Sequence, residues 1–468
     1  MALQPIQLAM ESNPSRALAA GSSQLVNCYL EQAGSDAKAP QQIWADDGLN
    51  DYLALPGTDP IRGWIDVDGT LYVVAGRQVY SVTANGTVTN IGGHPSEGTI
   101  YMERNLRDIP QIVIVSSDGV YSVIESGVIT RIDDTDLSLP TSLAYSDGFM
   151  AVTQNNGRWA HSEDNNAAQY DGLAYATAES NPDPSIRVVP KQRELVVFGT
   201  RSTEFWQNVG TSPFSYQRSQ AIEIGCGAAA SVAKVEQTLM WVADDFSVRI
   251  MNGYQGQKVS THAVDRAIRN APDRANLRAV TWRSGGHTFY ALSSAAFTWV
   301  YNLTTGKWHN KQSYGINRWR GNLAIEFNGK ILVADYASAR IFELNSDAMS
   351  ESTDPLVVKI VTPAIHITPS RLRFNALHVD IVTGVGNLAD TPDTRVPELM
   401  MRYSDDGGVS WSSEYRASIG VLGETRRRVV FRRLGMSGQQ GRVFELSCSA
   451  AVVRGFLGAT VDVEKLAA

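Results

Sequence analysis

The sequence has few cysteines, no long apolar run and no excess of basic residues. Its three cysteines, Cys28, Cys226 and Cys448, lie far apart, which predicts neither a disulfide framework nor a zinc knuckle. We therefore expect reduced, buried thiols, as in a protein made in the cytoplasm. No apolar run approaches the ~18 residues that a helix needs to span a bilayer, so we expect no membrane insertion.

The charge balance argues against a protein that grips nucleic acid tightly. The 468 residues include 41 Lys and Arg against 48 Asp and Glu, for a formal net charge of −7. A dedicated nucleic-acid binder usually carries a basic excess that neutralises phosphates. A wall past which DNA slides would also lack that excess. The composition therefore predicts weak contact with any passing DNA.

Motifs for catalysis and for metal or cofactor binding are missing from the sequence. The seven histidines include no pair at i and i+4 and no HExxH motif. There is also no GxSxG motif, no Walker A loop and no GxGxxG before a helix. We therefore predict no catalytic residue, no cofactor and no metal site. Paired carboxylates of glycosidases form in space, so the sequence alone leaves that class open.

What the sequence does contain is a β-rich unit repeated at a spacing of roughly 40 residues between Ile61 and Asn345. Each unit has an apolar strand, a polar turn, a strongly apolar strand and a strand with Tyr, Trp or Phe. Ten Asn-Gly or Asp-Gly dipeptides, typical of hairpin turns, punctuate the chain. Stacking such units around an axis covers their faces. The pattern predicts an all-β protein with a β-propeller of six or seven blades over residues 59–346.

The regions before and after the repeats do not follow the repeating strand pattern. Residues 1–58 look irregular, and residues 345–355 are polar and acidic, which predicts a linker. Residues 356–468 contain a series of short strand patterns, which predicts a C-terminal β-sandwich domain. Within the propeller, residues 261–271 predict a helix that ends at Pro272.

One motif in the predicted sandwich is the Asp-box, S-x-D-x-G-x-[ST]-W, with Ser404, Asp406, Gly408 and Trp411 at its fixed positions. It predicts a hairpin in which the Asp406 carboxylate accepts backbone N–H bonds across the turn. Gly408 would supply the unusual φ and Trp411 would pack beneath. Because the box lies away from the chemistry wherever it occurs, we interpret it as structural.

A dense basic cluster follows the Asp-box. If the segment is a strand, Arg426, Arg428 and Arg432 share one face, and Arg427 and Arg433 share the other. One interpretation is a docking patch for an acidic partner or a phosphate backbone. The other is an edge strand that its charge protects from aggregation. The sequence does not choose between them.

Several stretches, taken in order, resemble one phage protein family. They include QYDGLAYATAESNPD, IEIGCGAAASVAKVEQTLMWVADD, RGNLAIEFNGKILVADY and MRYSDDGGVSWSSEYRASIGVLGETRRRVVFRRLG, and they run from about Gln169 to Glu464. The early segments LVNCYLE and ALPGT fit the same family. The chain thus resembles the packaged-DNA stabilisation proteins of short-tailed bacteriophages, which form the tail hub or nozzle beneath the portal.

The resemblance implies a structural virion protein of the phage tail, made in the host cytoplasm. Its members form a homohexameric ring around the DNA exit channel, retain the packaged genome and later let it pass. They bind a tail adaptor ring above, and a tail needle, plug or spike below. Because the family has no catalytic residues, the resemblance carries none to this chain.

Two other functions remain open on the residues alone. A propeller glycosidase or sialidase is suggested by the box at Ser404, but a sialidase would also need three arginines, a tyrosine nucleophile and an acidic partner. A carbohydrate-binding module is suggested by aromatics such as Trp308 and Trp319, although we expect both to pack inside blades.

Overall fold

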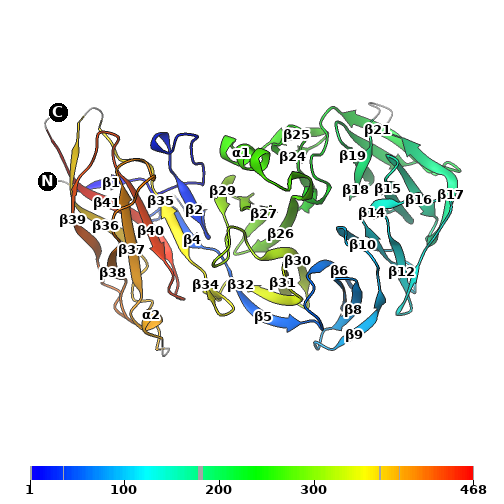
Figure 1. The fold of residues 1–468 in the computed structure, drawn as a ribbon, viewed down its shortest axis with the longest axis horizontal. Coiled ribbons are helices and arrows are strands. Elements are labelled where there is room, and N and C mark those ends of the chain that lie inside the picture. The colour runs from blue at the N-terminus through cyan, green and yellow to red at the C-terminus, as the bar shows by residue number, and fades with distance from the viewer. Residues whose placement is uncertain (1–2, 35, 178–182, 368–369, 389–390, 467–468) are drawn as a thin grey trace.

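The computed structural model describes residues 3–34, 36–177, 183–367, 370–388 and 391–466. These residues form a β-propeller of seven four-stranded blades beside a two-sheet β-sandwich (Figure 1). This confirms the predicted all-β architecture, and the number of blades is the higher of the two expected values.

Each blade is an antiparallel sheet. The first comprises β6 (Ile61–Val67), β7 (Thr70–Ala75), β8 (Gln78–Thr83) and β9 (Val88–Gly93). The second has β10 (Ile100–Arg104), β11 (Ile112–Ser116), β12 (Tyr121–Glu125) and β13 (Val128–Arg131), and the third β14 (Pro140–Ser146), β15 (Phe149–Gln154), β16 (Arg158–Glu163) and β17 (Asn166–Thr177). The fourth has β18 (Ser185–Lys191), β19 (Glu194–Gly199), β20 (Thr203–Asn208) and β21 (Tyr216–Ile222).

The fifth blade comprises β22 (Ala233–Val235), β23 (Thr238–Val242), β24 (Val248–Asn252) and β25 (Gln255–Lys258). The sixth has β26 (Arg278–Ser284), β27 (His287–Ser293), β28 (Thr298–Asn302) and β29 (Lys307–Asn310). The seventh is built from two distant parts of the chain. Its strands β30 (Gly321–Phe327), β31 (Lys330–Asp335) and β32 (Arg340–Asn345) are joined by β5 (Gly48–Ala54).

The apolar core of the propeller lies between blades. Seven clusters of buried side chains in the described residues each join two consecutive blades. One of them closes the ring, because Ile61 and Leu71 of the first blade pack with Leu332 and Ile341 of the seventh. Central strands such as β11 and β19 are continuous apolar runs, and because successive side chains point to opposite faces, such runs place hydrophobic side chains on both sides of a blade.

The predicted Asn-Gly and Asp-Gly turns explain why the blades are tight meanders. Asp68 and Gly69 between β6 and β7 have φ values of 52° and 80°, and Asn328 and Gly329 between β30 and β31 have 50° and 72°. Positive φ at both central residues is the mark of a type I′ turn, which matches the twist of the flanking strands. The turn chemistry therefore sets the register of these hairpins.

The N-terminal segment, residues 1–58, corrects the prediction of irregular structure. In its described part it contributes β1 (Gln4–Ile6), β2 (Gln24–Val26), β3 (Cys28–Gln32), β4 (Gln41–Ala45) and β5. β5 completes the seventh blade by pairing antiparallel with β32, and the other four strands enter the sandwich. β3 and β4 pair with each other as a local hairpin, whereas β1, β2 and β5 pair with strands hundreds of residues away, which local pattern does not reveal.

The sandwich therefore draws strands from both ends of the chain. One sheet has the order β3–β4–β41 (Gly455–Lys465)–β36 (Leu372–Ile381)–β39 (Val429–Met436), with β1 on β41. The other contains β2, β35 (Val358–Val361), β40 (Val443–Cys448), β37 (Glu398–Ser404) and β38 (Tyr415–Ser418). A single buried cluster, including Leu25, Cys28, Leu377 and Phe444, fills the space between them.

The second sandwich sheet is continuous with the sixth blade. β2 pairs in parallel with β29 through Val26 and Asn310, and pairs antiparallel with β35 through Val26 and Lys359. The result is a nine-stranded sheet with the order β26–β27–β28–β29–β2–β35–β40–β37–β38. Propeller and sandwich are thus joined by backbone hydrogen bonds.

The segment 345–355 is also a correction, because it is a packed hairpin. β33 (Ser350–Glu351) and β34 (Asp354–Pro355) extend the seventh blade beyond β5. Glu351 is fully buried and accepts a hydrogen bond from Trp319 Nε1 at 3.1 Å. An acidic residue in this segment thus serves the interior, which composition alone does not show.

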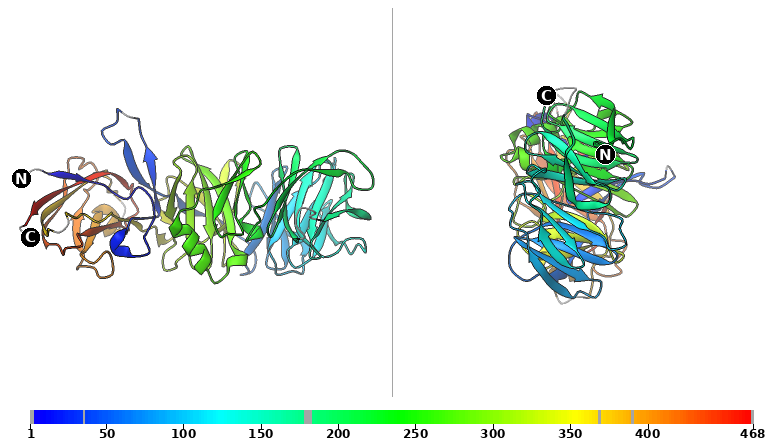
Figure 2. Two further views of the ribbon diagram at one scale, coloured as in Figure 1. Left: turned by 90° about the horizontal axis from the view of Figure 1, so that it is seen from above. Right: turned by 90° about the vertical axis from the view of Figure 1, so that its right-hand side faces the viewer.

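The predicted helix is confirmed as α1 (His262–Asn270). Thr261 is its N-cap and accepts a hydrogen bond from the backbone N–H of Val264. Elsewhere in the described chain, helical structure is limited to α2 (Pro392–Arg395) and the 3₁₀ turns Leu18–Ala20, Ala229–Ser231 and Arg274–Asn276. Figure 2 shows the propeller edge-on in line with the sandwich, with the β3–β4 hairpin projecting at their junction.

Candidate functional site

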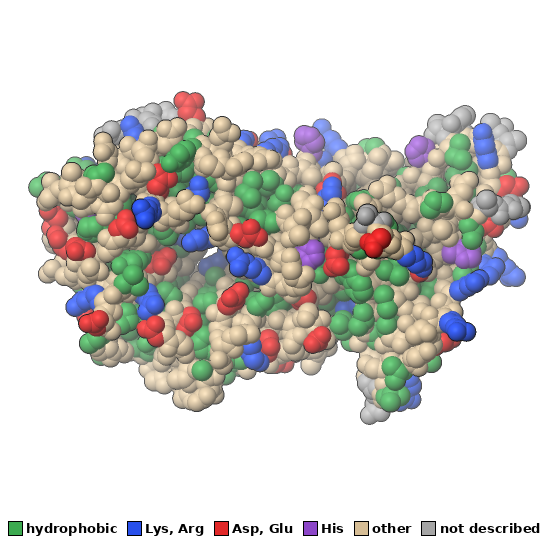
Figure 3. All heavy atoms as spheres, turned by 180° about the vertical axis from the view of Figure 1, so that it is seen from behind, with side chains coloured by type: hydrophobic (Ala, Val, Ile, Leu, Met, Phe, Trp, Pro, Cys, Tyr) green, Lys and Arg blue, Asp and Glu red, His purple; other side chains and the backbone are tan. Residues whose placement is uncertain are grey.

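The inner strands of the blades surround a central channel. β6, β10, β14, β18, β22, β26 and β30 form the innermost ring (Figure 1), and its consecutive members, apart from β18 and β22, lie against one another. Because each blade enters from its inner strand, these strands run in one direction along the axis. Their N-terminal residues therefore meet at one end of the channel. Figure 3 shows a hollow in this part of the molecule with basic side chains at its edge.

Basic side chains cross this channel between blades that are not neighbours. Arg278 of β26 donates a hydrogen bond from Nη2 to the backbone oxygen of Arg62 in β6, at 2.8 Å. Arg187 of β18 places its guanidinium 3.9 Å from the ring centre of Tyr101 in β10. Its Nη1 also donates to the backbone oxygen of Leu143, at 3.3 Å. We call Arg62, Arg187, Arg278 and the neighbouring Arg318 the channel arginines.

The electrostatics of the channel follow from burial and from the mutual proximity of these charges. The pKa of Arg278 is lowered to about 10, mainly by burial and also by Arg318, Arg62 and Arg187, against the opposing effect of Tyr101. Burial raises the pKa of the Glu103 carboxyl to about 7, although Arg187 and Lys234 act against this rise.

These residues include the side-chain types that a sialidase needs: three arginines, a tyrosine and a glutamate. Their arrangement does not suit a nucleophile. Burial raises the pKa of Tyr101, whereas an activated tyrosine needs a lowered one. Arg62 is occupied by backbone oxygens, with bonds from Nε to Gly76 and from Nη1 to Gly98 at 3.0 and 2.7 Å. The side chains therefore form a basic channel with no activated hydroxyl.

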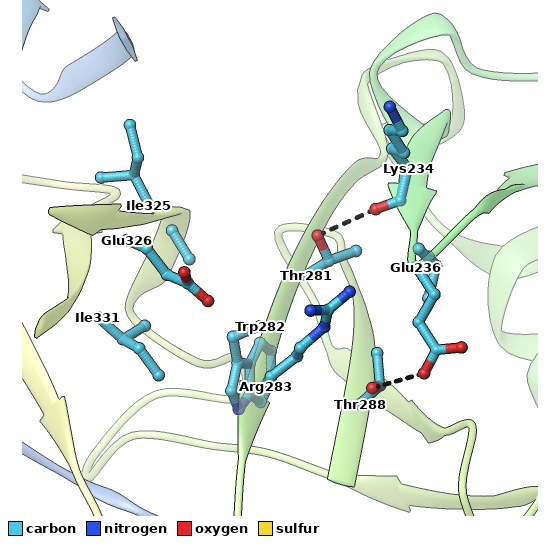
Figure 4. A pocket seen from close by; sticks show the side chains of 11 residues that line it. Lys234, Glu236, Thr281, Trp282, Arg283, Thr288, Ile325, Glu326 and Ile331 are labelled. Atoms are coloured by element: carbon cyan, nitrogen blue, oxygen red, sulfur yellow. Dashed lines mark hydrogen bonds between the residues drawn. The ribbon is translucent and has the colours of Figure 1, made fainter. Parts of the chain in front are cut away.

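A cavity of about 260 Å³ lies toward the opposite ends of β22, β26 and β30 (Figure 4). Thr288 Oγ1 donates to Glu236 Oε1 at 2.9 Å, and Thr281 Oγ1 donates to the backbone oxygen of Lys234 at 3.3 Å. Arg283 and Glu326 add charges of opposite sign to its lining. The hydroxyls here are engaged with glutamate and a carbonyl, and no catalytic set is apparent in this lining.

The Asp-box forms a compact hairpin between β37 and β38. Asp406 Oδ1 accepts hydrogen bonds from the backbone N–H groups of Val409 and Ser410, at 3.0 and 2.9 Å. Ser404 Oγ accepts from Gly408 N at 2.7 Å, and Gly408 has a φ of 102°. These bonds hold the pKa of Asp406 far below its ordinary value, with the side-chain hydroxyls of Ser404 and Ser410 as the largest causes.

Trp411 lies on the same hairpin, partly exposed, with its ring atoms 3.4 Å from where a Cβ on Gly408 would stand. The guanidinium of Arg402 is 5.5 Å from the Trp411 ring centre. The neighbouring Gly407 has its α-carbon against Ala19, where an added Cβ would come within 2.4 Å of the Ala19 backbone. The box thus fixes a corner of the sandwich against the N-terminal segment.

The basic cluster lies on β39, the last strand in the order of its sheet. The strand begins at Val429, so Arg426, Arg427 and Arg428 precede it in the adjoining loop. Arg432 and Arg433 are both exposed, because the register shifts between Phe374 and Ala376 on the partner strand. The predicted division of the arginines between two faces is therefore wrong. All five guanidinium side chains lie in solvent-exposed residues.

Other residues singled out from the sequence have structural positions. Trp308 and Trp319 are buried between blades, at 1% and 0% exposure, which leaves no aromatic platform there for a sugar. The three cysteines are buried and unpaired with one another. The described residues contain no cluster of three or more His, Cys, Asp or Glu able to hold a metal ion, and none of their helices has the length and apolarity to cross a bilayer.

Comparison with known families gives two matches that together cover most of the chain. A model described as "Bacteriophage P22 Gp10, beta-propeller" matches residues 37–349, and one described as "Bacteriophage P22 Gp10, beta-sandwich" matches residues 358–464. The chain belongs to the P22 Gp10 family. Members of this family are phage tail hub or nozzle proteins that stabilise packaged DNA.

Membership of the P22 Gp10 family assigns the protein to the structural components of a phage tail and gives no support to the glycosidase alternative. No curated protein matches the sequence. The N-terminal end of the propeller match, residue 37, precedes β5, the strand that closes the ring.

Solved structures with matching chains include "Crystal Structure of Mitotic Checkpoint Complex", with a TM-score of 0.43, 10% identity, and coverage of 67% of this chain and 95% of that one. A second is the Neurospora crassa Pan2 WD40 domain, with a TM-score of 0.41, 12% identity, and coverage of 65% and 95%. A third is the computationally designed Ika8 protein, with a TM-score of 0.40, 12% identity, and coverage of 74% and 100%. TM-scores in this range carry no functional argument.

Proposed function

We propose that the protein is the repeating subunit of a homohexameric ring around the DNA exit channel of a phage tail, where it retains the packaged genome and later allows its ejection. The observation that carries the proposal is the match of both domains, residues 37–349 and 358–464, to one tail-protein family. Closed rings use head-to-tail interfaces between identical subunits, which rigid building blocks favour. The subunit is made in the host cytoplasm and takes its place in the virion.

The decisive test is the stoichiometry of the assembled tail. Isolated tails are expected to contain this chain in a copy number divisible by six, measured by native mass spectrometry or by symmetry in a cryo-microscopy map. Any other copy number contradicts the hexamer. The purified chain alone is expected to remain a monomer until it meets the adaptor.

The exposed arginines of β39 and its preceding loop support a docking role. Arg432 lies on β39, the last strand in the order of its sheet, Arg426 and Arg428 lie in the loop before it, and all three residues are exposed. A basic edge suits an acidic surface on the tail adaptor ring, or on the needle, plug or spike. Arg427 pairs with Glu424 at 3.1 Å, so it contributes less net charge than the others.

A charge-removal series tests this docking role. The triple variant R426S/R428S/R432S is expected to bind adaptor-bearing capsids at least tenfold more slowly at low salt, because steering depends on net charge. The matched control is R77S, which removes an exposed arginine from the propeller. Equal association rates for the triple variant and the control would exclude docking through this edge.

Contact with passing DNA is expected to be weak. A chain with net charge −7 neutralises few phosphates, so the slope of log affinity against log salt is expected to stay below about 2 in magnitude. Filter binding of duplex DNA at several salt concentrations measures it. Tight binding at physiological salt would contradict a non-adhesive wall. Absence of turnover on fluorogenic sialosides is expected from the raised pKa of Tyr101.

A further inference from the structure

The channel arginines have no task in the proposed ring. Arg62, Arg187, Arg278 and Arg318 come from the first, fourth, sixth and seventh blades and their connections, and each is only partly exposed. None of the four forms an ion pair with a carboxylate of the described residues, which is unusual for four neighbouring, partly buried cations. Their hydrogen-bond acceptors are backbone oxygens and the Ser96 hydroxyl.

Some of their donors have no acceptor at all. Nε of Arg187 and Nη2 of Arg318 are buried and unpartnered. Arg278 uses Nη2 to reach across the channel to the first blade, and its other nitrogens donate no hydrogen bond to the described residues. Buried donors without partners cost free energy, so an acceptor that enters the channel gains from meeting them.

We propose that the channel arginines form a binding site for a small multivalent oxyanion of the phosphate class. The arginines project from different blades, so a ligand must present acceptors in several directions. A phosphate does this with four oxygens, whereas a carboxylate has two. Guanidinium groups match phosphate oxygens in geometry and charge.

The two arginines that carry the site are Arg187 and Arg278. Arg62 is fixed by the carbonyls of Gly76 and Gly98 and supplies charge alone. Arg318 stacks on Tyr336, with its guanidinium 4.2 Å from the ring centre, and supplies the unpartnered Nη2. The anion would bridge the fourth and sixth blades across the channel.

The geometry favours a free ion over DNA as the source of the phosphate. The bond from Arg278 to the Arg62 carbonyl and the stacking of Arg187 on Tyr101 both span the channel. A duplex cannot thread a passage that side chains occupy in this way. A free phosphate ion is much smaller than a duplex.

The test is a thermal-shift series on the full chain at constant ionic strength. Inorganic phosphate is expected to raise the melting temperature relative to chloride, saturating with concentration as a single site does. The double variant R187M/R278M is expected to lose at least nine-tenths of this increase. The matched control R193M removes an exposed arginine from the same blade as Arg187 and should keep the full increase.

Two readouts separate the outcomes. Selenate soaked into crystals of the wild-type chain should give an anomalous peak within hydrogen-bond distance of Arg187 and Arg278, a result that does not depend on the folding of a variant. An increase that is equal in chloride and phosphate, or that survives in a folded R187M/R278M, would overturn the proposal.

The DNA alternative is tested with a duplex oligonucleotide. Binding of duplex by the wild type but not by R187M/R278M would assign the site to nucleic acid and overturn the small-ion assignment. All these measurements use the isolated chain. A negative result therefore does not bear on the hexamer proposal, and the measurements test the anion site even if the protein does not form a hexamer.

Discussion

The two ends of the sandwich handle charge in opposite ways. At the end joined to the propeller, Asp46 is buried with His309 and Lys311, at distances of 3.2 Å from Oδ1 to Nε2 and 3.3 Å from Oδ2 to Nζ. At the far end, the arginines around β39 are exposed. Enclosed charges hold a junction in one geometry because separating them is costly. Solvated charges add little to stability and remain available to a partner.

The end joined to the propeller contains a second buried cation, which also contacts both domains or the segment between them. Arg454 is 1% exposed and donates to the backbone oxygens of Leu356 and Met349, on the segment that links the two domains. Lys311 is also 1% exposed, with its Nζ 5.1 Å from the Trp319 ring centre. These buried cations thus connect the sandwich and the propeller through side-chain contacts with the segment between the two domains and with Asp46.

The largest expected effect is that of breaking the Asp46 cluster. The variant D46A leaves Lys311 buried without its carboxylate and is expected to lower the free energy of unfolding by about 3–5 kcal/mol. Urea unfolding followed by tryptophan fluorescence measures it. The control D36A removes an exposed carboxylate from the β3–β4 hairpin and should change little. An equal decrease in the free energy of unfolding for D46A and D36A would show that the buried Asp46–Lys311 ion pair does not stabilise the junction.

A comparable effect is expected from the strand that closes the propeller. Leu49 of β5 is fully buried among side chains of the sixth and seventh blades. The variant L49A is expected to lower the free energy of unfolding by about 2–5 kcal/mol, because it leaves a cavity between the sixth and seventh blades. The exposed neighbour Asn50 provides the control N50A. Limited proteolysis should then cut the seventh blade first in L49A, and an unchanged cleavage pattern would contradict the closing role of β5.

The pH dependence of the joined end has a defined direction. Burial opposes ionisation of Asp46, but Lys311 and His309 outweigh it and hold its pKa at about 2, below the ordinary 3.8. For a depressed carboxyl pKa, the stabilisation is complete above the unfolded pKa and is lost as pH falls through the folded one. The urea midpoint should therefore fall more steeply between pH 4 and pH 2 in the wild type than in D46N. Parallel curves would contradict this assignment.

The smallest effect is expected at the free end. The single variant R432S removes an exposed charge and should change the free energy of unfolding by no more than about 0.5 kcal/mol. The triple variant R426S/R428S/R432S should leave the urea midpoint in place but lower solubility if the arginines also protect the edge of β39. Light scattering over time measures this. A large loss of stability would mean that these arginines have partners inside the fold.

The same comparison shows what the sequence reveals about this molecule. Blades were predictable because turns such as Asp68–Gly69 and the strands beside them are local signals. The strands β2 and β5 were not, because Val26 pairs with Asn310 and Lys359, and Leu49 pairs with Leu344. The local sequence pattern does not indicate a pairing strand that lies so far along the chain.

The arginines show the same difference between sites that are local in sequence and sites that form only on folding. The cluster from Arg426 to Arg433 was visible because its members are adjacent in sequence. Arg187 and Arg278 were not seen as a pair, since each is an isolated charge in its own blade and only the closure of the ring brings them together. The Asp-box was only partly predictable. The hydrogen bond from the Ser410 N–H to Asp406 joins residues close in sequence, whereas the contact of the box with Ala19 joins residues far apart.

The nine-stranded sheet has a mechanical consequence. A pull applied to the sandwich along its strands loads the short β2–β29 and β2–β35 ladders in shear, so that their hydrogen bonds break together and are not peeled one at a time. Tension from a pressurised capsid would therefore pass from one domain into the other without a hinge to absorb it. A tail built from such subunits would respond to internal pressure as a stiff collar.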